Sequence, residues 1–165
     1  MALKDYIFTS ESVSEGHPDK VCDQISDAIL DAFIANDVKL GHADDSHANT
    51  RLGCETLATT NKIVIAGEGR ASEPYMKKYG KHTIVNREAI SEIAREVVRD
   101  IGYDQDGFSF HGADIDVLLH GQSPDIAMGV DAKKKGGNLG EQEGAGDQGL
   151  MFGFACRDSE EYEKG

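Results

Sequence analysis

The chain has 165 residues, of which 39% are hydrophobic, and its 30 acidic against 17 basic side chains give a formal net charge of −13. This length and apolar content suit one folded domain with a core, and they argue against a disordered chain. The acidic excess repels phosphodiester backbones and anionic lipids, which argues against nucleic-acid and membrane binding, whereas it suits cations.

The cellular compartment is inferred from two features that the sequence lacks, a membrane-spanning segment and a secretory leader. The longest apolar runs, such as 63–66, are too short to cross a bilayer, and the first residues lack a basic stretch followed by an apolar one. We therefore expect a cytoplasmic protein. The cysteines Cys22, Cys54 and Cys156 are odd in number and far apart, which argues against disulfides and paired-thiolate zinc ligation and favours reduced core thiols.

Residues 5–9 alternate weakly and predict a short strand, and a helix is predicted from Pro18 to Ala35. The apolar residues of this helix recur at the spacing of one buried stripe, so it must pack on a sheet or on another helix. The stripe contains Val21, Ile25, Ala28, Ile29, Ala32 and Phe33. The other face carries acids at intervals of four, which we expect to be solvated, with Asp19 as the exception. These acids are Asp19, Asp23, Asp27 and Asp31.

The entrance to this helix has the composition of an anion site. Gly16 allows a turn, Pro18 suits the first helical position, and the free N–H groups behind it attract anions. His17, Asp19 and Lys20 flank that position. A first-turn acid is also an ordinary partner of the helix dipole, and a histidine before proline is often a cap, so the local pattern leaves both interpretations open.

Residues 41–49 have turn composition and predict a surface loop. An alternative function for its polar residues is opportunistic metal binding. These residues are His42, Asp44, Asp45 and His47.

Two strands are predicted next, at 50–60 and 62–69, around a turn at Thr60-Asn61. The apolar residues at 63–65 populate both faces, so we expect the sheet to be covered on both sides. Glu55 and Glu68 lie within these strands, where a buried carboxylate must be paired, hydrogen-bonded or metal-bound. They are therefore candidate site residues.

Residues 71–83 predict a loop with a short edge element at 75–79. A second helix is predicted between the cap residue Asn86 and the left-handed stop at Gly102. Its helical spacing is set by Ile90, Ile93, Ala94, Val97, Val98 and Ile101. After a turn at 103–107, alternation predicts a strand over 113–120. Residues 121–149 contain eight glycines and no apolar period, which predicts a lid or linker before a strand at 150–155.

Several strings of the chain occur in the order typical of one enzyme family. They are 8–20 with its continuation 23–28, Cys54-Glu55-Thr56, Gly67-Glu68, 122–126 and 144–153. Together they resemble the S-adenosylmethionine synthetases (methionine adenosyltransferases) over nearly the whole chain. Because the chain is less than half of the family's usual length, it resembles an amino-terminal fragment.

This resemblance implies an α+β fold, in which two main helices cover a mixed β-sheet and a second lobe begins. It implies an amino-terminal domain at 1–120, a flexible gating loop at 121–149 and the first strand of a truncated next domain at 150–165. The loop looks extended at 132–140. The resemblance also implies ATP and L-methionine as substrates, and a homodimer or dimer of dimers whose sites form between subunits.

The implied reaction moves the adenosyl group of ATP onto the methionine sulfur and cleaves the released triphosphate to pyrophosphate and phosphate. His17 matches the family histidine at the departing ATP oxygen, and Lys20 is the second expected catalytic residue. Asp19 matches a magnesium ligand, and Glu55 matches the acid of a potassium site. These assignments suit the chemistry, because negative charge develops on the leaving group.

Glu68 and Gln122 match residues that contact methionine, and Asp147 matches a further acid of the substrate region. The family's later phosphate-binding residues lie beyond Gly165, so the 165-residue chain alone is expected to be inactive. Two other hypotheses stay open. One is a truncated module that pairs with a complete subunit, and the other is an acidic cation-binding domain that uses the Asp19 helix face and the loop at 41–49.

Overall fold

The computed structural model describes residues 9–42, 49–80 and 82–122. In chain order its elements are α1 (Pro18–Lys39), β1 (Arg51–Thr59), β2 (Lys62–Arg70), β3 (Met76–Tyr79), β4 (His82–Val85), α2 (Arg87–Ile101), β5 (Asp104–Gln105), β6 (Phe108–Ser109) and β7 (Asp114–Gly121). Two helices and a mixed sheet confirm the predicted α+β class. The strands expected at 5–9 and 150–155 and the loop from 123 to 149 lie outside the described residues, apart from residue 9, which is not in a strand.

The main sheet has the strand order β1-β2-β7. β1 and β2 are antiparallel with Thr59 opposite Lys62, and β2 runs parallel to β7. Asn61 turns the β1–β2 hairpin with a positive φ of 53°, a conformation that asparagine tolerates better than most residues. The predicted turn and both predicted strands are confirmed within one residue at each end.

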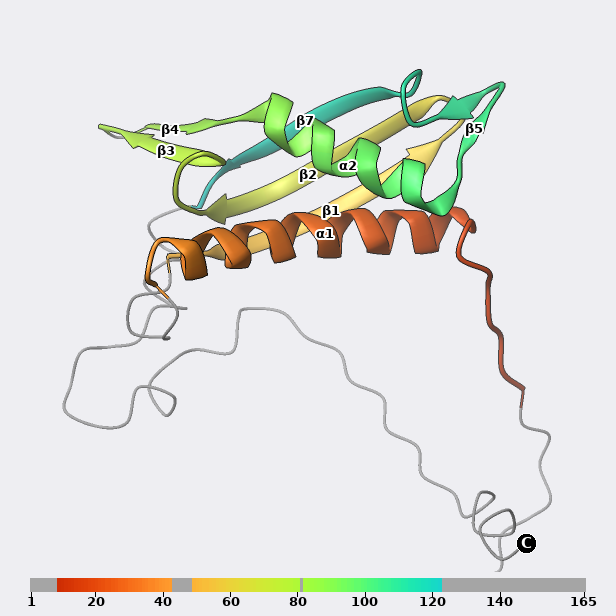
Figure 1. Ribbon diagram of the computed structural model, residues 1–165, viewed down its shortest axis with the longest axis horizontal. Helices are drawn as coiled ribbons and strands as arrows, with labels where there is room; N and C mark the ends of the chain where they lie inside the picture. The colour runs from red at the N-terminus through yellow and green to blue at the C-terminus, as the bar shows by residue number, and fades with distance from the viewer. Residues whose placement is uncertain (1–8, 43–48, 81, 123–165) are drawn as a thin grey trace, which may run out of the picture. The chain divides into compact units, whose positions relative to one another are not determined.

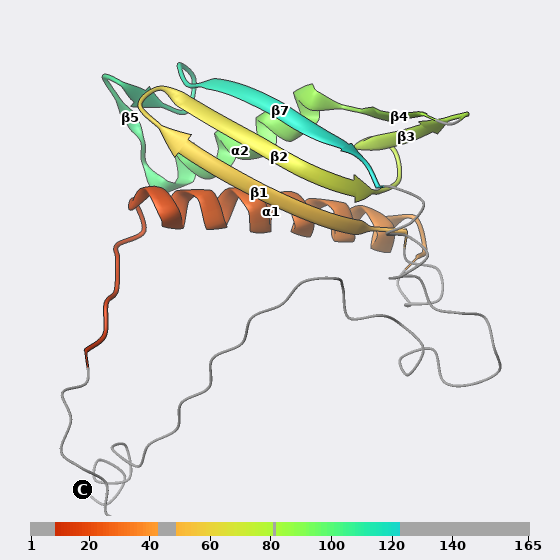
Figure 2. The same ribbon diagram turned by 180° about the vertical axis from the view of Figure 1, so that it is seen from behind.

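Both helices pack on one face of this sheet, as the opposite views in Figures 1 and 2 show. The core between them is formed by the predicted helical stripes and by alternate strand residues. Its buried members include Val21, Ile25, Ile29, Phe33, Ile90, Ala94, Val98, Ile63, Ile65, Val117 and Leu119. Burial of such side chains contributes about 1.5–3 kcal/mol each, so this interface is what holds the helices to the sheet.

The expected cover on both sides of the sheet is wrong for the part of the chain that the structure describes. On the face away from the helices, Leu57 is 59% exposed and Leu118 is 56% exposed. Figure 2 looks onto this face, which we call the open face. It carries residues 53, 55, 57 and 59 of β1, 62, 64, 66, 68 and 70 of β2, and 114, 116, 118 and 120 of β7. The apolar residues at 63–65 therefore did not mean that a second layer covers the other face of the sheet.

Helix α1 extends to Lys39, four residues past its predicted end. Asp37 explains the difference, because this acid is only 3% exposed and belongs to the buried face of the helix. Its Oδ2 accepts hydrogen bonds from the backbone N–H groups of Asn49 (2.9 Å) and Thr50 (2.7 Å), and its Oδ1 accepts one from Ser72 Oγ (3.3 Å). A polar residue thus joins the end of α1 to the start of β1.

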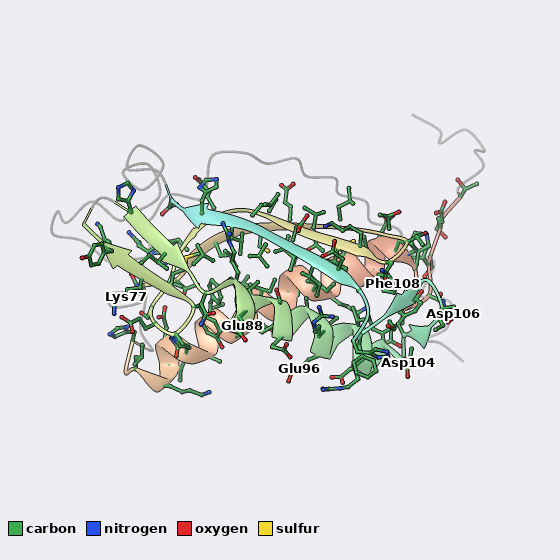
Figure 3. All side chains as sticks on the ribbon, turned by 90° about the horizontal axis from the view of Figure 1, so that it is seen from above. Lys77, Glu88, Glu96, Asp104, Asp106 and Phe108 are labelled. Carbon is green, nitrogen blue, oxygen red and sulfur yellow. The ribbon has the colours of Figure 1, made fainter. Side chains whose placement is uncertain are left out.

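Two small hairpins stand at opposite ends of the sheet in Figures 1 and 2. β3 falls within the edge element predicted at 75–79, whereas its antiparallel partner β4 was not predicted. β5 and β6 form the other hairpin inside the segment expected to turn. Helix α2 between them is confirmed with both of its caps, since Asn86 Oδ1 accepts from Ala89 N (3.2 Å) and Gly102 has a φ of 98°. Its polar side, which includes Glu88 and Glu96, is labelled in Figure 3.

Cys22 and Cys54 are free and half-buried, as expected, and Cys156 lies outside the described residues. Burial is the main cause that raises the pKa of both thiols. In the described part of the chain, neither helix is long and apolar enough to cross a membrane.

Candidate active site

His17 is the N-cap of α1, with the extended backbone angles φ −64° and ψ 138°. Its Nδ1 accepts a hydrogen bond from the Asp19 backbone N–H (3.2 Å), and its carbonyl accepts the first helical bond from Val21 N (2.9 Å). Pro18 occupies the first helical position, as predicted. Because Nδ1 is an acceptor here, the proton of the neutral ring is on Nε2. The cap therefore presents an N–H donor at the end of the helix.

The carboxylate of Asp19 is available for a ligand. Its side chain is 88% exposed, and its Oδ2 lies 3.9 Å from His17 Nδ1, which is too long for a hydrogen bond. Lys20 is also exposed. Within residues 9–42, 49–80 and 82–122, no three His, Cys, Asp or Glu side chains gather into a metal-binding group. Water and phosphate oxygens are ligands that a hard cation at Asp19 could accept beside this carboxylate.

The turn that leads into α1 is held by a residue that follows the other helix. The hydroxyl of Tyr103 donates to the carbonyl of Gly16, and His17 N donates to Ser14 O (3.0 Å). A Cβ atom at Gly16 would lie 3.2 Å from Tyr103 Oη. Gly16 is not one of the described glycines with a positive φ, so the turn does not need a glycine for its backbone angle. The glycine is favoured here because Tyr103 approaches closely.

An open cleft of about 440 Å³ lies beside the start of α1. It is bounded by the first turn of α1, the β1–β2 turn and the β5–β6 hairpin. Its lining residues are Pro18, Val21, Ala58, Thr59, Thr60, Tyr103, Gln105, Asp106, Gly107 and Phe108. Figure 3 labels Asp106 and Phe108 on that hairpin. The cleft therefore lies next to the His17 cap, and its lining is more apolar than polar.

Glu55 and Glu68 both lie on the open face. Glu55 pairs with Ala66, and Glu68 pairs with Gly53, so the two acids are diagonal neighbours across β1 and β2. Such a diagonal spacing is about 7–8 Å, and Gly53 puts no side chain beside Glu68. Glu55 is exposed and Glu68 is half-buried. The expectation that strand position would bury Glu55 is wrong, because the open face has no helix over it.

Gln122 directly follows β7 and extends its pairing, since its backbone N donates to Gly69 O (2.8 Å). Its Oε1 is buried and has no hydrogen-bond partner among the described residues. His120 pairs with Glu68 on the open face and was not singled out from the sequence. The alternation of β7, which puts 114, 116, 118 and 120 on one face, is the sequence signal that could have placed His120 there.

The structure divides the predicted site residues into two groups. His17, Asp19 and Lys20 lie at the start of α1, and their neighbours Pro18 and Val21 line the cleft together with Ala58–Thr60 at the hairpin end of the sheet. Glu68 and Gln122 lie toward the other end of β2 and β7, and Glu68 faces the open side. Ala58 and Gly53 are separated by about 17 Å at 3.3 Å per strand residue. One copy of the described domain therefore does not bring the two groups together. Asp147 lies outside the described residues.

Comparison with known proteins identifies the family. The model of the S-adenosylmethionine synthetase N-terminal domain matches residues 5–124. The chain belongs to the S-adenosylmethionine synthetase family. An S-adenosylmethionine synthase of Nitrobacter hamburgensis is 56% identical over 154 residues, which are 93% of this chain and 35% of that protein. The S-adenosylmethionine synthase 2 of Rhodopseudomonas palustris is 55% identical over 154 residues, with the same two shares.

A solved S-adenosylmethionine synthetase from Campylobacter jejuni matches with a TM-score of 0.49 and 28% identity, over 72% of this chain and 27% of that one. The chain spans about a third of the length of the curated synthases that it matches. The family-model match over residues 5–124 confirms the family named from the sequence motifs, and this region contains every helix and strand that the structure describes.

Proposed function

We propose that this chain supplies the amino-terminal part of an enzyme that makes S-adenosylmethionine from ATP and L-methionine in the cytoplasm. The adenosyl group moves to the thioether sulfur, and the triphosphate is then cleaved to pyrophosphate and phosphate. The observation that carries the proposal is the family match over residues 5–124, together with a capping histidine whose free nitrogen is a donor. The names of the relatives support the product, S-adenosylmethionine.

His17 and Lys20 are the proposed catalytic residues. A neutral thioether sulfur attacks C5′ of ATP without a general base, so the developing negative charge is on the departing triphosphate oxygen. The Nε2–H of His17 donates to that oxygen, and the Lys20 ammonium adds positive charge within the same helical turn. The free N–H groups at the start of α1 favour the same anion.

Magnesium and potassium are the proposed cofactors. The exposed carboxylate of Asp19 fits magnesium, which binds one or two protein carboxylates and takes its remaining ligands from water and phosphate. Magnesium would neutralise charge on the triphosphate. The exposed carboxylate of Glu55 fits a monovalent cation on the open face, where Glu68 is its diagonal neighbour.

Glu68 and Gln122 are proposed to hold methionine. The carboxylate of Glu68 suits the ammonium group of an amino acid, and the buried, unpartnered Oε1 of Gln122 suits a polar hydrogen of the same ligand. Asp147 is assigned to the substrate region by family resemblance alone.

The separation of the two groups supports a proposal that a second subunit completes the site. The face that carries Glu55 and Glu68 also exposes Leu57 and Leu118, which suits contact with another subunit. We therefore propose a homodimer, or a dimer of dimers, in which each site takes residues from two chains. The same open face favours the alternative that this chain is an interaction module without activity of its own. The cation-binding alternative has no comparable support.

A chimeric enzyme tests the proposal. Residues 1–165 replace the aligned part of the Nitrobacter hamburgensis synthase, to which this chain is 56% identical over 154 residues. We expect the chimera to form S-adenosylmethionine from ATP and methionine, and the purified 165-residue chain to form none. A folded chimera without activity, beside an active parent enzyme, would contradict the proposed function. Turnover by the 165-residue chain would contradict the requirement for the rest of the enzyme.

A further inference from the structure

We infer that Tyr103 is a positioning residue for His17. Tyr103 follows α2, whereas His17 opens α1, and the two are separated by more than eighty positions in the sequence. The inference rests on the proposed function of His17 as the donor to the leaving group. In this inference Tyr103 does not contact the substrate. It fixes the peptide group that directly precedes the His17 side chain.

The peptide group between Gly16 and His17 is held at both of its polar atoms. Its carbonyl oxygen accepts from the Tyr103 hydroxyl, and its N–H donates to Ser14 O (3.0 Å). The plane of this peptide and the φ angle of −64° together set where the His17 side chain begins. A rotation of the plane would move the imidazole relative to everything outside α1.

Tyr103 is itself held firmly enough to act as an anchor. It follows the left-handed cap Gly102, and its backbone N donates to Val98 O (3.1 Å). Its carbonyl accepts from Phe110 N (3.1 Å), and its ring packs edge-on against Phe108 with centroids 5.0 Å apart and planes at 86°. The hydroxyl therefore has little freedom, because both the backbone and the ring of Tyr103 are constrained.

The hydrogen bonds at and next to His17 divide into two kinds. The bond from Asp19 N to Nδ1 and the bond from Val21 N to the His17 carbonyl are both local to α1. They orient the ring with respect to its own helix. The bond from Tyr103 connects the turn before His17 to the second helix and the β5–β6 hairpin, so it orients that turn with respect to the rest of the domain. A reaction that depends on the position of Nε2–H is sensitive to this second kind of bond, because errors of about 1 Å cost up to roughly 100-fold in rate.

Two substitutions separate positioning from folding. Tyr103→Phe removes the hydroxyl and keeps the ring that packs on Phe108. Gly16→Ala keeps the hydroxyl but places a Cβ 3.2 Å from it, so that the tyrosine must shift by a few tenths of an ångström. Tyr79→Phe is the matched control, because Tyr79 is 71% exposed on the β3–β4 hairpin at the far end of the sheet.

The variants are compared in the chimeric enzyme by steady-state kinetics. We expect Tyr103→Phe to lower kcat by roughly 10-fold or more, with KM for ATP changed by less than about 3-fold. Gly16→Ala should lower kcat in the same direction by less, and Tyr79→Phe should leave both constants unchanged. Unchanged kcat in Tyr103→Phe would overturn the inference.

Nitrogen-15 NMR of the histidine rings in the 165-residue chain supplies a readout that does not depend on activity. We expect one His17 tautomer with its proton on Nε2, and exchange-broadened His17 signals in Tyr103→Phe. Sharp, unshifted His17 signals in the variant would overturn the inference even if its melting temperature fell, because the bond would then only support folding. If the unsubstituted chimera is inactive, the proposed function fails, whereas the NMR comparison still decides whether Tyr103 positions His17.

Discussion

The hydrogen bonds of the buried Asp37 carboxylate predict how much its substitution lowers the free energy of unfolding. Its three accepted hydrogen bonds come from Asn49 N (2.9 Å), Thr50 N (2.7 Å) and Ser72 Oγ (3.3 Å). A hydrogen bond to a charged group contributes about 1.5–3 kcal/mol and a neutral one about 1 kcal/mol. Asp37→Asn keeps the shape and an acceptor for the two backbone donors but loses the charge. We expect it to lower the free energy of unfolding by about 1–2 kcal/mol.

Asp37→Ala should cost more, because it leaves two backbone N–H groups of Asn49 and Thr50 without an acceptor. We expect a loss of about 3–5 kcal/mol. Urea unfolding of the 165-residue chain, followed by circular dichroism at pH 7, measures both variants. Asp31→Asn is the control, because Asp31 is exposed on the same helix. An Asp37→Asn variant as stable as the Asp31→Asn control would refute the role given to this carboxylate.

The pH dependence gives an independent check. Burial alone would raise the pKa of Asp37, but the hydrogen bonds from Thr50, Asn49 and Ser72 outweigh it and hold the pKa below its ordinary value. A lowered folded-state pKa contributes stability above the unfolded pKa of about 3.9, and this stability is lost as the pH falls toward the folded value. The difference in stability between the unsubstituted chain and Asp37→Asn should therefore shrink below about pH 4. A difference that stays constant or grows there would contradict the assignment.

Three further predictions concern the proposed site and surface. Asp19→Asn in the chimera should raise the magnesium concentration that gives half-maximal turnover by roughly 10-fold, and an unchanged magnesium titration would remove Asp19 from the metal site. Glu68→Gln should raise KM for methionine by about 10-fold, the equivalent of 1.4 kcal/mol, with little change in KM for ATP; equal effects on both substrates would count against a methionine contact. Leu118→Arg should weaken dimerisation of the chimera in analytical ultracentrifugation, whereas the equally exposed Ile84→Arg on the β3–β4 hairpin should not. A dimer unaffected by Leu118→Arg would exclude the open face as the subunit contact.

Local signals predicted most of the fold. The helix period, the cap at Asn86 and the left-handed stop at Gly102 depend on neighbours within one helical turn, so α2 could be placed from the sequence. The burial of Asp37 could not be predicted, because a buried acid and a solvated acid look the same in a helical sequence. Its hydrogen-bond donors, Asn49, Thr50 and Ser72, come from segments outside the helix. The partner strand β4 and the uncovered sheet face were missed for a related reason, since pairing and cover depend on segments that are distant in the sequence.

The candidate site shows the same division. The His17 cap could be predicted from the five residues at 16–20, because a cap is made by adjacent residues. The bond from Tyr103 to Gly16 has no local signature, and the exposure of Glu55 follows from which face of the sheet the helices cover. Family resemblance assigned roles to these positions, but the separation of the two groups became visible only in three dimensions.

The central claim is that the His17 imidazole donates to the departing triphosphate. His17→Asn tests it most directly, because asparagine is also a good N-cap and should preserve the start of α1 while removing the ring donor. Rapid-quench single-turnover kinetics of the chimera measure the adenosyl-transfer step. We predict a step slowed by roughly 100-fold or more, with ATP affinity changed by less than about 3-fold. An adenosyl-transfer rate equal to that of the unsubstituted chimera would contradict the claim.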